Sequence, residues 1–331
     1  MDKSVQSNLT SVFIKNFKSV KSVTLSDCRR INVLIGRPNV GKSNILEALA
    51  LFDVPYMVNS SNKSLKKLLR IENTADLFHN GVSSSPVEVS ADENSLSVNR
   101  STNNGLNVDI NVKSEISKYS FSPSLTLLSK KAPEIPPDVL AFFFPKHFTA
   151  ESANFRFLLP PSGTNLMEIV ANMPELKSNL TELFYGYGLK MMFDSGSQQI
   201  KAMRENGFDM FLVPFSSLAD SLQRLIFYKA AIKSNYNKTI CFEEPEAHTF
   251  PQYISNVVND IIASTSNQFF ITTHSPYVIN SLLESASDDL AVYVVDMSSN
   301  STTVKRLTDD QLQDAYGNGM DMFYNIEAYL E

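Results

Sequence analysis

A segment at positions 36–43 has a residue spacing that suits the binding of phosphate groups. It reads Gly-Arg-Pro-Asn-Val-Gly-Lys-Ser and fits the pattern G-x-x-x-x-G-K-[ST], with an apolar run before it and a helical pattern after it. Glycines at the two ends let backbone N–H groups face phosphate oxygens, Lys42 can reach the β and γ phosphates, and Ser43 can ligate Mg²⁺. The alternative is a glycine-bounded turn in front of a helix. The predicted nucleotide contacts are Gly36, Arg37, Pro38, Asn39, Val40, Gly41, Lys42, Ser43 and Asn44.

Two adjacent carboxylates, Glu243 and Glu244, follow an apolar run at 239–242 that is typical of a buried strand. A phosphate-binding loop upstream requires such a partner. We expect Glu243 to hold Mg²⁺ through water, and Glu244 to polarise the attacking water as a general base. The alternative is that the two acids cap the following segment.

A second apolar run, at 269–273, ends in His274. A lone histidine at a strand end is usually a polar cap. His274 follows Glu244 by one helix and one strand, however, and the carboxyl ends of parallel strands meet at one edge of a sheet. We therefore expect His274 beside Glu244, facing the γ-phosphate.

The elements around these residues indicate an α/β fold. Segments 12–17 and 20–25 alternate as half-buried strands do, 31–35 reads as a buried strand, and 42–52 has the apolar spacing of a helix. Alternation within 82–124, with Asn-Gly at 104–105, predicts a small antiparallel meander, and a serine-rich linker is the alternative. A mostly helical stretch follows at 166–185. The predicted domains are an N-terminal part of the ATPase domain at 1–54, an insertion at 55–205 and a C-terminal part at 206–331.

One basic stripe stands out in the predicted insertion. Lys63, Lys66, Lys67 and Arg70 recur at helical spacing, so a helix here would carry them on one face. This face is either a solvated surface or a contact for a phosphate backbone or a partner, so DNA binding through these four residues is open.

The composition of the chain excludes several classes of protein and of binding site. The chain has 331 residues, 43% of them apolar and 19% charged, with a net charge of −6, so any nucleic-acid contact must come from a local patch. We expect no membrane span and no signal peptide, and hence a cytoplasmic protein. Cys28 and Cys241 are the two cysteines, which excludes a disulfide framework and a cysteine zinc site.

These segments together resemble the ABC-type ATPases of the RecF, SMC and OLD group, in particular OLD-like ATPase domains of bacterial defence proteins. The pairing of Glu-Glu-Pro-Glu-Ala-His at 243–248 with Thr-Thr-His-Ser-Pro at 272–276 carries the likeness, which covers about 10–55 and 210–285. The resemblance implies a P-loop NTPase fold of the ABC/SMC-head type, with a mixed sheet, an antiparallel N-terminal β lobe, and an inserted β-meander and helical region. It matches Glu243 to the Walker B acid, Glu244 to the catalytic glutamate and His274 to the switch histidine. It places His248 in a segment that usually crosses a dimer interface.

The weakest part of the resemblance is the signature segment at 215–224. In the family this turn closes on the ATP of the other subunit, but Ala219 and Ser221 stand here where glycines are expected. Ser217 or Ser221 can still supply a hydroxyl, and we expect Asp220 to cap a helix that starts near Leu222. An ordinary capped helix without a role across the interface is the alternative.

The resulting prediction is an ATP-hydrolysing, Mg²⁺-dependent switch that forms a homodimer or higher oligomer. The resemblance implies a separate effector, with a nuclease as one candidate, and a role in bacterial anti-phage defence or DNA-related processes. The alternatives are the ATPase subunit of an ABC transporter and an ATP-binding module with little turnover. Paired acids at 288–289 and 309–310 do not read as a TOPRIM nuclease centre, so we expect no such domain; instead 292–296 and 302–307 predict a hairpin, followed by a helix ending at Glu331.

Overall fold

The computed structural model describes residues 8–58, 63–131, 138–151 and 155–330. The chain divides into two compact units. The first comprises Met1–Ala141, Asn237–Glu244 and Gln268–Glu331, and the second comprises Phe142–Tyr236 and Pro245–Asn267. The division of the chain at residues 54 and 205 stays a prediction.

A six-stranded mixed sheet forms the centre of the first unit, in the order β16-β15-β3-β14-β13-β9. Its strands are β3 (Ile31–Ile35), β9 (Val139–Phe142), β13 (Thr239–Glu243), β14 (Gln268–Thr272), β15 (Leu290–Ser298) and β16 (Ser301–Arg306). Strand β3 runs parallel to both β14 and β15, and every residue of β3 is buried. Such continuous apolar burial is typical of parallel strands that are covered on both faces.

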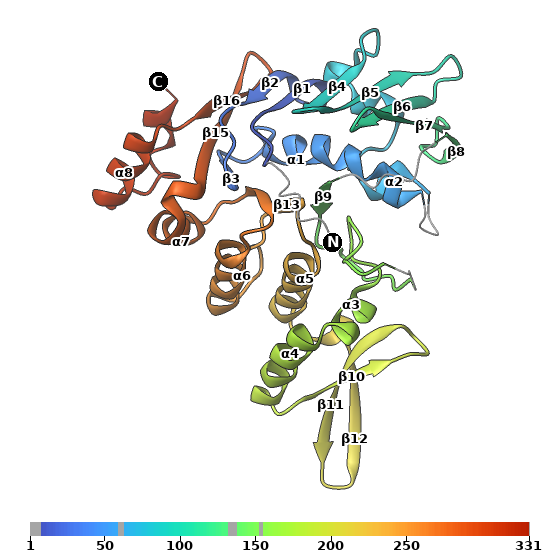
Figure 1. The fold of residues 1–331 in the computed structure, drawn as a ribbon, viewed down its shortest axis with the longest axis vertical. Coiled ribbons are helices and arrows are strands. Elements are labelled where there is room, and N and C mark those ends of the chain that lie inside the picture. The colour runs from blue at the N-terminus through green and yellow to red at the C-terminus, as the bar shows by residue number, and fades with distance from the viewer. Residues whose placement is uncertain (1–7, 59–62, 132–137, 152–154, 331) are drawn as a thin grey trace. The chain divides into compact units, whose positions relative to one another are not determined.

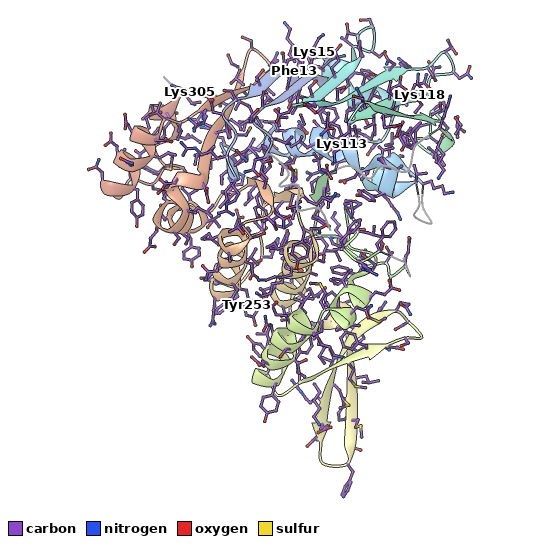
Figure 2. All side chains as sticks on the ribbon, in the orientation of Figure 1. Phe13, Lys15, Lys113, Lys118, Tyr253 and Lys305 are labelled. Atoms are coloured by element: carbon purple, nitrogen blue, oxygen red, sulfur yellow. The ribbon has the colours of Figure 1, made fainter. Side chains whose placement is uncertain are left out.

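A seven-stranded antiparallel sheet, in the order β2-β1-β4-β5-β6-β7-β8, belongs to the same unit. Its strands are β1 (Val12–Phe17), β2 (Val20–Leu25), β4 (Val87–Ala91), β5 (Asn94–Arg100), β6 (Leu106–Val112), β7 (Glu115–Phe121) and β8 (Leu127–Lys131), so the predicted meander is confirmed. Figure 2 labels Lys15 and Lys118 on this sheet, where Lys15 pairs across the strands with Glu88 at 3.0 Å. Val12 and Ile14, on the opposite face of β1, are fully buried.

Helix α1 (Lys42–Ala50) packs against β1 of the antiparallel sheet and against β13 and β14 of the mixed sheet (Figure 1). Because it has a sheet on two sides, almost all of its residues are buried, including the acidic Glu47. The α-helix ends at Ala50, two residues before the predicted end at residue 52, and a 3-10 turn, Leu51–Asp53, follows it. The other α-helices of this unit are α2 (Val54–Met57), α7 (Pro276–Ala286) and α8 (Asp309–Gly317).

Asp53 is a fully buried carboxyl group directly after α1. Its Oδ2 accepts a hydrogen bond from the backbone N–H of Ala141 at 2.8 Å, while Oδ1 has no hydrogen-bond partner among the described residues. Burial raises the pKa of Asp53 well above 3.8, and the hydrogen bond from Ala141 opposes this shift only in part.

This raised pKa predicts a specific dependence of stability on pH. The folded chain keeps the Asp53 proton at pH values where the unfolded chain has lost it, so this contribution is complete below about pH 4 and disappears as the pH rises through the folded pKa. We expect the free energy of unfolding, measured with urea, to fall with pH more steeply in the wild type than in Asp53→Asn. Asp310→Asn, at an exposed acid, is the control. Equal slopes for the wild type and Asp53→Asn would contradict the assignment.

The predicted basic helix is wrong. Residues 65–67 form a single 3-10 turn, Leu65–Lys67, and Ser64 forms an isolated bridge with Thr126. The backbone N–H of Leu65 donates to the carbonyl oxygen of Leu125 at 3.0 Å, and that of Leu127 donates to the carbonyl oxygen of Lys63 at 2.9 Å, so this segment pairs with a distant one instead of continuing as a helix. Lys63, Lys66, Lys67 and Arg70 therefore do not share a helix face.

The hairpin near the end of the described chain is confirmed as β15 and β16, which pair antiparallel. The predicted helix after it is only partly right. Helix α8 ends at Gly317, and a short 3-10 turn, Ile326–Tyr329, follows after an irregular stretch. The predicted end of the helix, Glu331, lies outside the described residues.

The second unit contains α3 (Leu166–Asn172), α4 (Pro174–Gly186), α5 (Asp220–Ser234) and α6 (Pro251–Ala263). The predicted helical stretch is thus two helices, and Pro174 stands at the start of the second. The unit also has a three-stranded antiparallel sheet of β10 (Lys190–Asp194), β11 (Gln199–Asn206) and β12 (Asp209–Pro214), which the sequence analysis missed.

The start of α5 differs from expectation. The helix begins at Asp220 rather than near Leu222, and its N-cap residue is Ala219. The Asp220 carboxylate pairs with Arg224 one turn later, at 3.0 Å, so its predicted capping role is wrong. Within the described ranges, no helix has the length and the apolar character that crossing a membrane requires.

Candidate functional site

The loop between β3 and α1, residues 36–43, is called the phosphate loop below. Its glycines are required by close contacts. A Cβ atom on Gly36 would lie 2.2 Å from the carbonyl oxygen of Val295, and one on Gly41 would lie 2.1 Å from Oγ1 of Thr302. Gly41 also has φ +102°, a left-handed conformation that side chains disfavour. The glycine spacing of the motif therefore follows from the backbone conformation of this loop.

Two hydroxyl groups from segments distant in the sequence support the phosphate loop. Thr302, on β16, donates a hydrogen bond from Oγ1 to the carbonyl oxygen of Val40 at 2.9 Å. Ser19, in the turn between β1 and β2, has its Oγ 2.7 Å from Thr302 Oγ1 and accepts a hydrogen bond from Asn44 Nδ2 at 2.7 Å. Asn44 was a predicted nucleotide contact, and here it ties α1 to this turn.

Lys42 is buried, and its ammonium group lies over the phosphate loop. Nζ donates hydrogen bonds to the carbonyl oxygens of Gly36 at 2.9 Å and Arg37 at 2.8 Å. Ser43 is half-buried in the first turn of α1, where the N-terminal end of the helix favours negative charge. The loop thus offers a positive charge, a hydroxyl group and a helix N-terminus.

The two carboxylates and the histidine lie at the ends of neighbouring parallel strands. Glu243 is the last residue of β13 and is in register with Thr272 of β14. The backbone N–H of Glu244 donates to the carbonyl oxygen of Thr272 at 3.0 Å, which holds Glu244 at φ +40°. His274 Nε2 lies 3.4 Å from Glu244 Oε1. The order of strands in the sequence predicted this proximity of Glu244 and His274.

The surroundings of His274 keep its imidazole neutral. Burial lowers its pKa below 6.5, and the nearby charge of Lys42 lowers it further, while Glu244 acts in the opposite direction. At pH 7 the ring therefore carries one proton. A neutral ring whose Nε2 faces the Glu244 carboxylate can hold that carboxylate by a hydrogen bond.

An open cavity of about 540 Å³ collects many of these groups within the first unit. It is lined by Lys18, Pro38, Asn39, Gly41, Lys42, Ser43, Asn44, Glu47, Arg70, Asp76, Glu244 and His274. Phosphate oxygens suit the Lys42 ammonium, and Mg²⁺ prefers oxygen ligands such as the Ser43 hydroxyl. The Glu243 carboxylate is not part of this lining, but it contacts Nη2 of the lining residue Arg70 at 2.5 Å. The residues present therefore fit a magnesium nucleotide.

Three residues of this cavity escaped the sequence analysis: Lys18, Glu47 and Asp76. Glu47 left a signal, because an acid within the apolar helical segment 45–52 must be buried beside a partner. Lys18 and Asp76 left none, since their place depends on contacts between distant segments. Arg70 belongs to the basic group for which DNA contact was left open, and its Nη2 lies 2.5 Å from Glu243 Oε1.

Three further predicted residues, Ser217, Ser221 and His248, belong to the second unit. Ser217 is exposed at the end of a 3-10 turn, Phe215–Ser217, and Ser221 is half-buried near the start of α5. His248 is exposed in the segment after β13. Their roles at a dimer interface stay predictions.

Comparison with known proteins shows the family. A family model described as "AAA domain, putative AbiEii toxin, Type IV TA system" matches residues 31–280, which is more than half of the chain. A head domain of Smc from Pyrococcus furiosus, solved bound to the C-terminal domain of ScpA, has a similar fold with a TM-score of 0.51 and 14% identity, over 94% of this chain and 99% of that one.

Two proteins are similar over short segments. An ATP/GTP phosphatase of Helicobacter pylori is 38% identical over 63 residues, which are 19% of this chain and 16% of that protein. An uncharacterised protein of Methanocaldococcus jannaschii is 43% identical over 47 residues, which are 14% of this chain and 22% of the relative. The matches thus span less than a quarter of either relative. On the extent of the family match the chain belongs to this AAA-domain family, and its P-loop fold is similar to that of the Smc head.

Proposed function

We propose that this protein is a Mg²⁺-dependent ATPase that works as a molecular switch. The observation that carries the proposal is the shared cavity, in which the phosphate loop faces Glu244 and His274. Lys42 would exchange the carbonyl oxygens of Gly36 and Arg37 for the β and γ phosphate oxygens. Mg²⁺, held by Ser43 and Glu243, would neutralise charge on the phosphates.

Glu244 would accept a proton from the attacking water. The 3.4 Å contact with His274 would keep its carboxylate oriented toward the γ-phosphate. Because the histidine pKa is lowered, the ring stays neutral in this role at pH 7. Hydrolysis of ATP in the presence of Mg²⁺, and its loss in variants at Glu244, test the proposal.

We further propose that two copies close head to tail around two nucleotides, with Ser217 and Ser221 reaching the ATP of the opposite subunit. Closure would act on a separate effector, for which a nuclease of a bacterial defence system is our candidate. The family description, which names a toxin–antitoxin system, supports a role with a partner protein. The ScpA domain bound to the similar Smc head supports the use of a partner by this fold.

A mixing experiment tests the shared sites. Ser221→Glu would place negative charge against the partner's γ-phosphate, and Lys42→Ala would disable the phosphate loop, so each variant alone should be inactive. In a heterodimer both defects can fall on one site, which leaves the other site whole. We expect the mixture to recover part of the wild-type ATPase rate.

The matched control is Ser178→Glu, which adds the same charge on the exposed surface of α4. This variant should keep its activity alone. No recovery in the mixture, with heterodimers shown to form, would contradict independent shared sites.

A further inference from the structure

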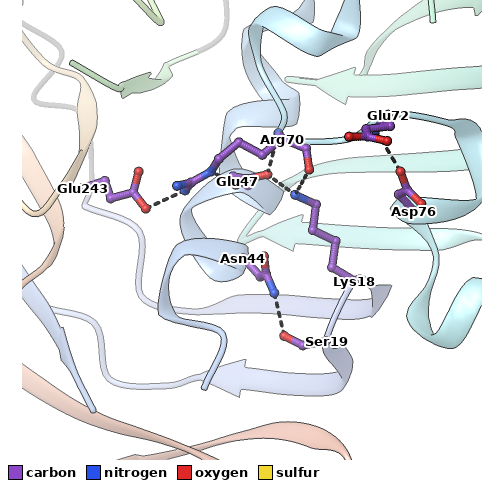
Figure 3. A network of polar contacts seen from close by, with 8 residues as sticks. All are labelled: Lys18, Ser19, Asn44, Glu47, Arg70, Glu72, Asp76 and Glu243. Atoms are coloured by element: carbon purple, nitrogen blue, oxygen red, sulfur yellow. Dashed lines mark hydrogen bonds and ion pairs between the residues drawn. The ribbon is translucent and has the colours of Figure 1, made fainter. Parts of the chain in front are cut away.

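Glu47 is a buried acid that the proposed hydrolysis does not use. Its side chain is 2% exposed, and it lies on α1 one turn after Ser43. Figure 3 shows Lys18 and Arg70 converging on its carboxylate. Lys18 forms an ion pair with Oε2, and Arg70 donates from Nε to Oε1 at 2.7 Å. A carboxylate this deeply buried requires such partners, so the arrangement is built rather than incidental.

Arg70 is fixed along its main chain as well as at its side chain. Its backbone N–H donates to Glu47 Oε2 at 3.2 Å, and its carbonyl oxygen accepts from Lys18 Nζ at 3.1 Å. The neighbouring Leu69 and Ile71 are buried. The backbone of Arg70 is therefore fixed, although its side chain is 63% exposed.

The far end of this guanidinium group reaches Glu243. Nη2 lies 2.5 Å from Oε1 of Glu243, whose side chain is 17% exposed. The same planar group thus joins α1, which carries Ser43, to the end of β13, which carries Glu243. Hydrogen-bond partners of a metal-ligating carboxylate, which do not contact the metal themselves, fix its orientation toward the metal ion.

We propose that Arg70 is a positioning residue for Glu243: anchored by Glu47 and Lys18, it holds the Glu243 carboxylate in the orientation that binds Mg²⁺ beside Ser43. The inference rests on the proposed function, because that function assigns Mg²⁺ to Glu243. It adds three residues, Arg70, Glu47 and Lys18, that serve the metal without touching it.

The test measures metal affinity directly, with Mn²⁺ as the probe, on the full chain with saturating ATP. Arg70→Met should weaken Mn²⁺ binding by about 10- to 100-fold, while ATP affinity in EDTA stays at the wild-type value. Arg70→Lys should weaken Mn²⁺ binding as well, because an ammonium group cannot reach Glu47 and Glu243 together. Arg100→Met, at an exposed arginine of β5, is the matched control and should change neither affinity.

A comparison with Glu243→Gln separates the inference from the proposed function. If Glu243→Gln leaves Mn²⁺ affinity unchanged, the assignment of the metal to Glu243 fails. If Glu243→Gln weakens Mn²⁺ binding and Arg70→Met does not, or strengthens it, the positioning role alone is overturned. A loss of ATP affinity in EDTA for Arg70→Met would mean that Arg70 contacts the nucleotide itself, which also overturns it.

The double variant gives a further check. Arg70→Met in the Glu243→Gln background should cause no additional loss of Mn²⁺ affinity, because Arg70 acts through the carboxylate that is already absent. An additive loss would contradict the inference. Thermal unfolding of each variant without ligand identifies any that fail to fold, and Arg70→Lys then serves in place of Arg70→Met.

Discussion

Lys42→Ala is expected to abolish both ATP binding and ATP hydrolysis. The ammonium group is buried over the phosphate loop, and its two hydrogen bonds to loop carbonyls put it where phosphate oxygens would bind. Alanine removes that charge, while the backbone N–H groups and the start of α1 remain. Titration with a fluorescent ATP analogue measures the affinity, and release of phosphate measures the turnover.

Lys66→Ala is the control for this change, because it removes a lysine that is exposed outside the cavity. It should leave affinity and turnover unchanged. Wild-type nucleotide affinity in Lys42→Ala would refute the assignment of the phosphate loop.

The second large effect is expected for Glu244→Gln. Glutamine keeps the size of the side chain and leaves the backbone hydrogen bond to Thr272 in place, but its amide cannot accept a proton from water. Turnover should therefore fall by roughly 10²-fold or more, while ATP and Mg²⁺ still bind. The variant should also accumulate as a closed dimer with ATP, which size-exclusion chromatography detects.

Glu284→Gln, at an exposed acid on α7, controls for the loss of one negative charge. A different result is expected if the roles of Glu243 and Glu244 are reversed. If Glu243→Gln impairs hydrolysis more than Glu244→Gln and spares Mg²⁺ binding, the roles of the two residues are exchanged.

The parts of the site that follow from local rules were predictable. A strand, a glycine-bounded loop and a helix in direct succession fix the phosphate loop, and parallel strands that end at one edge bring His274 to Glu244. The helical spacing of the four basic residues predicted a helix that does not form, because the backbone at 63–65 instead pairs with residues 125–127, far away in the sequence.

Other features depend on pairs that no local pattern reveals. The ion pair of Lys18 with Glu47 joins a turn of the antiparallel sheet to α1, and the contact of Arg70 with Glu243 joins residues separated by 173 positions. The strands β10, β11 and β12 were missed although the chain carries turn signals for them. Gly188 stands before β10, and Asn206-Gly207 lies at the hairpin turn that joins β11 to β12.

The hydrogen bond from Thr302 to Val40 of the phosphate loop has a consequence for the order of events during synthesis of the protein. Val40 and Thr302 are 262 positions apart, so Thr302 leaves the ribosome long after Val40 does. Contacts of such long range also form late in folding, because their loop-closure entropy must be offset first. A nascent chain that carries the entire G-x-x-x-x-G-K-[ST] motif but not yet β16 lacks this hydrogen bond, so Thr302 supports the phosphate loop only after β16 has been synthesised.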